Sequence, residues 1–267
     1  MSWPAILAAY GSYLVGAALV RRVPKHAVRS SAAFAAAAWA LLLLSRTTTW
    51  LEAPMVSIWL PAAAVLAAYR ATGPLFDRPQ TSLERRLLAV DSRVLGGPSG
   101  VRALAGLPRV VIEALEASYL LTYAALPAGA VTLHVFGPAD ALAEYWAIVM
   151  ASSLTCYGAL PWIRTRPPRA LEDRDPYAGR PSWFRRINLE VLARGSIHVN
   201  TLPSGHAASV TAAAVAVAHH LPAAGAAFGI LALMIATAAV TGRYHYVVDS
   251  VLGVAIAVGY WLWVGPG

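Results

Sequence analysis

Long apolar stretches, almost free of charge, are the feature that most limits what this chain can fold into. A helix needs around 20 mostly apolar residues to cross a bilayer core about 30 Å thick. Of all residues 58% are hydrophobic and 13% are charged, whereas a soluble domain has about 25% charged residues. We therefore expect an all-α fold, a multi-pass membrane bundle of about eight transmembrane helices. The expected spans are Trp3–Val20, Ser31–Ser45, Pro54–Tyr69, Val110–Leu133, Ala141–Ile163, His206–His219, Ala223–Thr241 and Tyr246–Val264.

Two polar stretches between these spans are long enough to matter. Ala71–Arg109 has leucines at helical spacing interleaved with charged residues, which predicts an amphipathic helix on the membrane surface. An ordinary solvated connector is the alternative. The second stretch, Arg164–Pro203, holds most of the residues that suggest chemistry.

The distribution of basic residues predicts an orientation. With eight spans, 20 of the 21 Lys and Arg residues fall in loops on one face, and only Arg46 lies on the other. Positive charge in short loops marks the cytoplasmic face. Despite the net charge of +8, these residues sit between apolar runs, so we expect no nucleic-acid partner. The single cysteine, Cys156, excludes a disulfide framework and a cysteine-built zinc site.

Three short segments place ionisable residues at the ends of apolar helices on that same face. They are Arg164–Arg169 (RTRPPR), Pro203–His206 (PSGH) and Gly242–Asp249 (GRYHYVVD). An ionisable residue at such a position is costly and is a functional hypothesis by default. Each segment alone has an ordinary explanation: a basic topology anchor, a capped helix start, or a structural His–Asp pair. Their occurrence together on one face predicts a site.

The first two segments suit a bound phosphate group. A helix that begins at the PSGH segment leaves the amides of Ser204, Gly205 and His206 without helical partners. These donors and the helix dipole form an anion site. The guanidinium groups of Arg166 and Arg169 suit bidentate contact with phosphate oxygens.

The third segment suits nucleophilic catalysis. His245 and Asp249 lie four residues apart, so they share one face if the helix has already begun at His245. The carboxylate can accept from one imidazole nitrogen and leave the other as a nucleophile. His206 can then protonate a leaving oxygen.

Other polar residues allow two explanations each. Glu116 either braces an arginine of the site or forms an interhelical hydrogen bond. His198 and Asn200 either support the site or lie in a solvated loop. His219 and His220 are expected in the short loop on the opposite face, in a structural role.

These three segments resemble the signature of the type-2 phosphatidic acid phosphatase superfamily, which also includes the soluble vanadium haloperoxidases. The family pattern is K-x6-R-P, then P-S-G-H, then S-R-x5-H-x3-D. Pro203–His206 matches the second part fully and His245–Asp249 matches H-x3-D. The resemblance covers about Pro54 to Val264, since the family core has six helices. It implies a lipid-phosphatase-like core in residues 51–267 and two additional membrane helices in residues 1–50.

The sequence departs from the pattern at two positions. Ala239 stands where the family has an arginine six residues before the nucleophilic histidine, and Ala159 stands where it has the lysine of the first motif. Arg243 is expected to supply the first missing charge, and Arg164 or Arg169 the second. This divergent branch also resembles the lipid phosphotransferases that make sphingomyelin and inositol phosphorylceramide.

The resemblance implies a mechanism without a metal or a cofactor. His245 attacks phosphorus and is oriented by Asp249, His206 protonates the leaving group, and water then hydrolyses the phosphohistidine. The residues implied to hold the phosphoryl group are Arg166, Arg169, Ser204, Gly205 and Arg243.

The expected function is that of an integral-membrane lipid phosphate phosphatase in the cell membrane, with its active site on the cytoplasmic face. Its substrate would be a lipid phosphate or diphosphate. One alternative is a lipid phosphotransferase, in which a second alcohol takes the phosphoryl-bearing group. The other is a transporter or structural membrane protein without enzymatic activity. The sequence leaves open the lipid tail, isoprenyl or diacylglycerol, and the oligomeric state.

Overall fold

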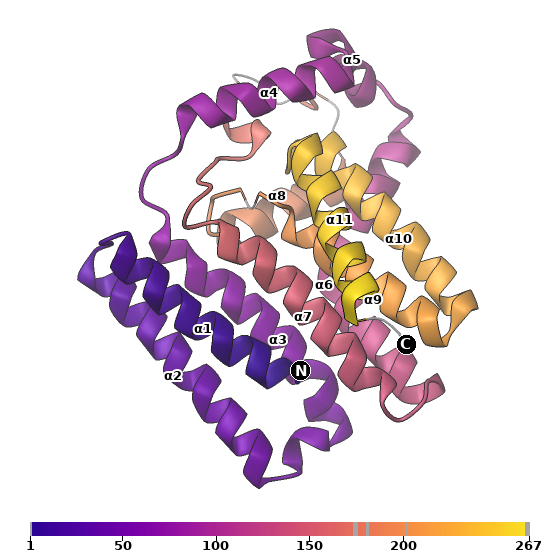
Figure 1. Cartoon of the computed structure of the whole chain (residues 1–267). Helices are drawn as coiled ribbons and strands as arrows, with labels where there is room; N and C mark the ends of the chain where they lie inside the picture. Colours follow the sequence, from indigo (N-terminus) through magenta and orange to yellow (C-terminus); the bar gives the residue numbers. More distant parts are fainter. Residues whose placement is uncertain (1, 173–175, 180–181, 201, 265–267) are drawn as a thin grey trace.

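The structure, a computed structural model, describes residues 2–172, 176–179, 182–200 and 202–264 as a bundle of helices (Figure 1). Within these residues there are eleven α-helices and no strands, which confirms the all-α prediction. The helices are α1 (Trp3–Val20), α2 (Lys25–Thr47), α3 (Pro54–Thr72), α4 (Thr81–Leu95), α5 (Gly97–Ala105), α6 (Arg109–Phe136), α7 (Ala141–Ala159), α8 (Trp183–Gly195), α9 (Gly205–His220), α10 (Pro222–Thr241) and α11 (Val247–Val264).

A helix stands at each of the eight expected spans. Six helices of the described chain are long and apolar enough to cross a membrane: α1, α2, α3, α6, α10 and α11. The second of these extends beyond both ends of the apolar run Ser31–Ser45, because the polar residues that flank the run continue the helix. The other two expected spans are α7 and α9. They lie among the six and form much of the interior of a helical membrane bundle.

Small residues let α9 sit at the centre of this bundle. The helix packs against α6, α7, α10 and α11. Its sequence from Ala207 to Ala218 is rich in alanine, and most of these residues are buried. In a membrane, where lipid is as apolar as leucine, such small residues allow close helix packing. The first turn of α9, which carries the PSGH motif, is thereby fixed among its neighbours.

Buried aromatic residues on α7 fill the space beside α9 and keep their polar atoms bonded. The Trp146 indole donates to the carbonyl of Ser57 at 2.8 Å, and the Tyr145 hydroxyl donates to the carbonyl of Leu126 at 2.6 Å. A buried Tyr or Trp usually finds such a partner. These bonds join α7 to α3 and to α6.

Helices α4 and α5 lie across one end of the bundle (Figure 1). They confirm a helix within the stretch Ala71–Arg109. The buried face of α4 carries Glu84, Leu87 and Asp91, and Leu87 packs against Leu202 and Tyr246. The apolar side that we expected to lie on the membrane is thus used in part to cover the loops that carry the three motifs. Helix α8, within Arg164–Pro203, was not anticipated as a separate element.

Candidate active site

The three motif segments come together where α9 and α11 begin. Asp249 lies in the first turn of α11 and is fully buried. Its carbonyl oxygen accepts a hydrogen bond from the amide of Ser204 at 2.9 Å. This bond joins the PSGH segment directly to the segment that carries His245.

The two predicted catalytic histidines face each other beside the predicted carboxylate. His245 Nδ1 lies 3.4 Å from Asp249 Oδ2, and His245 Nε2 lies 3.4 Å from His206 Nδ1. Both contacts are longer than a typical hydrogen bond. With Nδ1 directed at the carboxylate, Nε2 is the nitrogen of His245 available for chemistry. The predicted contact is present, although α11 begins at Val247 and His245 therefore lies in the loop before the helix.

Asn200 connects this carboxylate to the first motif. Its side-chain amide donates to Asp249 Oδ2 at 2.7 Å and to Thr165 Oγ1 at 3.2 Å. Its backbone amide donates to the Thr165 carbonyl at 2.8 Å, in an isolated antiparallel bridge. Of the two explanations left open for Asn200, the structure supports contact with the site. His198 lies nearby, exposed, with a positive φ of 58°.

The beginning of α9 differs from the predicted anion site in one respect. The Ser204 side chain caps the helix and accepts from the amide of Ala207 at 3.3 Å. The Ser204 amide, predicted to be without a partner, instead donates to Asp249. A Cβ at Gly205 would collide with the ring of Tyr157, so this glycine is required by a close aromatic neighbour. Part of the predicted anion site therefore serves to hold α9 against α7 and α11.

Two of the three predicted phosphate-binding arginines are held by carboxylates of α4. Arg166 Nε and Nη2 contact the two carboxylate oxygens of Glu84 at 3.0 and 2.8 Å, and its backbone amide contacts Oε1 at 2.8 Å. Arg243, 3% exposed, contacts Asp91 and Glu172 at 2.8 Å each. A buried guanidinium needs such partners to offset its lost hydration. These two side chains contact carboxylates of α4, a pairing that was not predicted from the sequence.

Arg169 is placed differently from the other two arginines. Its guanidinium carbon lies 5.3 Å from the centre of the Tyr244 ring, and its side chain lines the same cavity as His206 and His245. Its backbone amide donates to the Arg243 carbonyl at 3.2 Å. The rigid Pro167-Pro168 pair and this bond hold Arg169 beside the two histidines.

The cavity beside these residues has a volume of about 550 Å³. At one end it is lined by His206, His245 and Arg169, and its walls are largely apolar residues of α3, α6 and α8. On α3, Trp59 and Leu66 line the cavity and are 51% and 49% exposed. The cavity therefore extends from the histidines to the outer side of α3.

Stacked aromatic rings support the histidine that was predicted as the acid. Tyr119 of α6 stacks on His206 with ring centres 5.1 Å apart, and on Tyr244 with centres 4.2 Å apart. The Tyr244 hydroxyl donates to Glu116 Oε2 at 2.6 Å. No local sequence pattern predicts this contact of Tyr119, because the histidine beside it lies 87 positions away in the chain.

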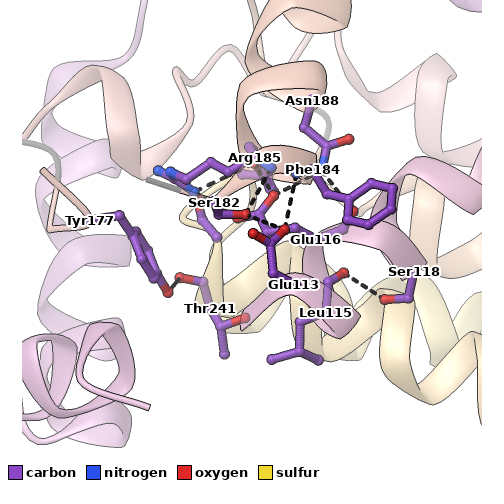
Figure 2. Close-up of polar contacts among 12 residues, drawn as sticks. Glu113, Leu115, Glu116, Ser118, Tyr177, Ser182, Phe184, Arg185, Asn188 and Thr241 are labelled. Carbon is purple, nitrogen blue, oxygen red and sulfur yellow. Dashed lines mark hydrogen bonds and ion pairs between the residues drawn. The ribbon is translucent and has the colours of Figure 1, made fainter. Parts of the chain in front are cut away.

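A buried ion pair between Arg185 and Glu116 holds α8 against α6 (Figure 2). Arg185 Nη1 contacts Glu116 Oε1 at 2.9 Å, and the amide of Asn188 donates to Glu116 Oε2 at 2.8 Å. Glu113 accepts from the first backbone amides of α8, those of Trp183 and Phe184. A carboxylate is favourable at a helix N-terminus. Of the two explanations considered for Glu116, the structure supports the interhelical one, because its partners Arg185 and Asn188 lie on α8 and neither is a predicted site residue.

Comparison with known proteins agrees with the motif analysis. Residues 142–265, from α7 to the end of α11, match the model of the PAP2 superfamily. No curated protein and no solved structure matches the chain. The matched range contains all three motif segments, and the boundary predicted near residue 50 lies outside it. This match and the motifs within it are consistent with a member of the type-2 phosphatidic acid phosphatase superfamily.

Proposed function

We propose that the protein is a membrane phosphatase that hydrolyses a lipid phosphate or diphosphate through a phosphohistidine intermediate. The observation that carries this proposal is the cavity itself. It has two facing histidines and an arginine at one end, and apolar walls that reach the exposed edge of α3. A phosphate with an apolar tail fits both parts of such a cavity.

In the first step, His245 Nε2 attacks the phosphorus atom. The N–P bond forms while the bond from phosphorus to the lipid oxygen breaks, and protonated His206 gives its proton to that oxygen. Because the phosphorus comes between the two rings, substrate binding must separate the 3.4 Å contact between His245 and His206. Asp249 stabilises the imidazolium that develops on His245.

In the second step, water attacks phosphorus and the N–P bond breaks. His206, now neutral, takes a proton from the attacking water and returns to its starting state. Free phosphate leaves, and His245 is again available. An alcohol in place of water would complete the same step as a phosphotransfer.

We assign the main charge contact with the phosphoryl group to Arg169. It lines the cavity, whereas Arg166 and Arg243 are engaged by carboxylates. A guanidinium and backbone amides fixed before the reaction stabilise charge where it develops in the transition state. We assign to Arg166 and Arg243 the separate role of holding α4 over the motif loops.

We assign the lipid tail to the apolar part of the cavity. Its walls include Trp59 and Leu66 of α3 and Leu126 of α6. An amphiphilic substrate already resides in the bilayer, so an opening beside α3 admits the tail without exposing it to water. Replacing Leu66 by a charged residue should raise KM for a long-tailed phosphate more than for a short-chain one.

Purified protein in detergent tests this function with a panel of lipid phosphates and diphosphates. Each substrate is assayed with and without EDTA, and with and without an added lipid alcohol. We expect release of free phosphate that persists in EDTA, is inhibited by vanadate, and is abolished in His245→Ala. A phosphorylated alcohol as the main product would favour a phosphotransferase. Phosphate release by folded His245→Ala at the rate of the unaltered protein would overturn the proposed mechanism.

We also propose that the active site faces the cytoplasm, on the basis of the 20 basic residues on that face. The test is a single cysteine at Ser99, an exposed position of α5, in a Cys156→Ala background. We expect an impermeant thiol reagent to label it only after the cells are opened. A cysteine at Thr49, in the connection between α2 and α3, should react in intact cells. The reverse pattern would place the site outside and leave the catalytic assignment unchanged.

A further inference from the structure

A second cluster of ionisable side chains lies at the opposite end of the bundle from the histidine site. Glu144 is in the first turn of α7, and His219 and His220 are the last two residues of α9. One side-chain ligand atom of each residue lies within 4.8 Å of the others. At 1.5 Å of rise per residue, the part of α9 between His206 and His220 is about 21 Å long. The proposed phosphatase mechanism makes no use of this cluster.

The closest pair in the cluster already has the spacing of two ligands on one metal ion. His220 Nε2 lies 3.2 Å from Glu144 Oε2. Two ligand atoms that each bind zinc at about 2.05 Å in tetrahedral geometry lie about 3.3 Å apart. The ring centre of His219 is 4.5 Å from that of His220, and its side chain is exposed. A ligand nitrogen of His219 lies within 4.8 Å of the ligand atoms of both other residues, so His219 is the candidate for a third ligand.

The other carboxylate oxygen of Glu144 provides an independent observation. Glu144 Oε1 is buried and has no hydrogen-bond partner among the described residues. A buried acceptor without a partner destabilises the fold, and more so when it is charged. A cation held by this carboxylate would remove that cost, whereas the hydrogen bond to His220 alone leaves it in place.

We propose that Glu144, His219 and His220 form a binding site for a divalent transition metal, with Zn²⁺ as the ion that fits best. Two imidazoles and one carboxylate are a known three-ligand set for zinc, with water in the fourth position. Imidazole ligands favour zinc, copper or nickel over magnesium and calcium. The ion would join the beginning of α7 to the end of α9, on the opposite side of the bundle from the phosphatase site. The proposal does not depend on the function proposed above.

The test uses the full chain, purified with an affinity tag that contains no histidine and stripped of metal with a chelator. Titration calorimetry with ZnCl₂ should show one site per chain, and MgCl₂ should show none. Zinc should also raise the melting temperature in detergent. The variants His219→Gln and His220→Gln should each weaken zinc binding at least tenfold. The matched control is His134→Gln, an exposed histidine in the last turn of α6 at the same end, which should bind zinc as the unaltered protein does.

The facing histidines of the phosphatase site are the main competing source of zinc binding, and a further variant separates the two. His245→Ala should keep the high-affinity zinc site if the ion binds at Glu144, and should lose it if the ion binds beside His206. His219 is exposed, so its substitution should leave the fold intact and keeps the test decisive even if a change at Glu144 destabilises the protein. Absence of saturable zinc binding, or binding that is unchanged in His219→Gln and His220→Gln, would overturn the proposal.

Discussion

Substitution of Gly253 by alanine tests whether the contact between α9 and α11 sets the geometry of the active site. Gly253 lies one turn after Asp249 on α11. A Cβ at this position would lie 2.5 Å from the carbonyl oxygen of Ser204, and the neighbouring atoms of Ala207 and Ala208 are at 3.2 Å. Real Cβ contacts are almost never closer than 3.0 Å, so the two helices must separate by at least about 0.5 Å. The obstacle is backbone, which cannot rotate away.

The expected loss of stability combines three contributions. Overpacking costs about 1–3 kcal/mol. The bond from the Ser204 amide to the Asp249 carbonyl lengthens from 2.9 Å toward the limit of a hydrogen bond, which costs about 0.5–1.5 kcal/mol. The higher helix propensity of alanine returns about 1 kcal/mol. We therefore expect a net loss of about 2 kcal/mol.

Activity should fall more sharply than stability in the Gly253→Ala variant. Since Asp249 and His245 move with α11 while His206 stays on α9, we expect kcat to drop about tenfold or more, because a 1 Å displacement can cost about a hundredfold. The matched control is Gly259→Ala on the same helix, where nothing lies within 4 Å of the added Cβ. Its melting temperature and kcat should be unchanged or slightly higher. If the two variants had the same melting temperature and the same kcat, the reasoning would be refuted.

Three other changes separate the roles of the polar residues around the site. Asn200→Ala removes the side-chain amide that donates to Asp249, so kcat for phosphate release should fall about ten- to a hundredfold with little change in KM. A change in KM alone would contradict the role of Asn200 in positioning Asp249. Arg169→Lys keeps the positive charge but loses the planar guanidinium, so the inhibition constant for vanadate should rise about tenfold or more. Arg166→Lys should alter this constant little. Equal effects of the two substitutions would contradict the assignment of Arg169 as the main phosphate contact. The hydrogen bond from Arg166 lowers the pKa of Glu84 in the folded protein. This pair therefore stabilises the fold at pH values above the carboxyl pKa of the unfolded chain, about 4.3. The stabilisation is lost as the pH falls through the lower pKa of the folded state. The melting temperature of Glu84→Gln should therefore decline less than that of the unaltered protein between pH 6 and about pH 3.5, and parallel curves would show that this pair does not contribute.

The parts of the fold that follow from local pattern could be predicted from the sequence. Apolar runs bounded by charge located a helix at all eight expected positions, because a membrane helix is specified by its own composition. The contact between His245 and Asp249 is present as predicted, but His245 lies in the loop just before α11 and not on a face of that helix. Their position beside His206 requires that separate segments of the chain meet at the same end of the bundle. The count of spans between these segments predicted that they lie on the same side of the membrane.

Long-range partners could not be read from the sequence in this way. Glu84 looked like one of several charges on an amphipathic helix, yet it is buried and holds Arg166. Asp91 likewise holds Arg243 across more than 150 positions of sequence. Helical periodicity shows which residues of α4 share a face, but it does not show what that face covers.

These ion pairs change how the many arginines around the site are understood. Arg164 pairs with Asp77, Arg166 with Glu84, Arg243 with Asp91, and Arg185 with Glu116. Each pair joins the motif loops or α8 to another part of the chain. The pairs Arg185–Glu116 and Arg243–Asp91 are buried on both sides, and breaking a pair of this kind costs about 3–5 kcal/mol. Such pairs fix the positions of loops that have few apolar contacts of their own. Arg169 differs because, among the described residues, its guanidinium pairs with no carboxylate and instead lies over the Tyr244 ring and lines the cavity beside the two histidines. An incoming phosphate therefore competes with no carboxylate for Arg169, whereas at Arg166 or Arg243 it would first have to displace one.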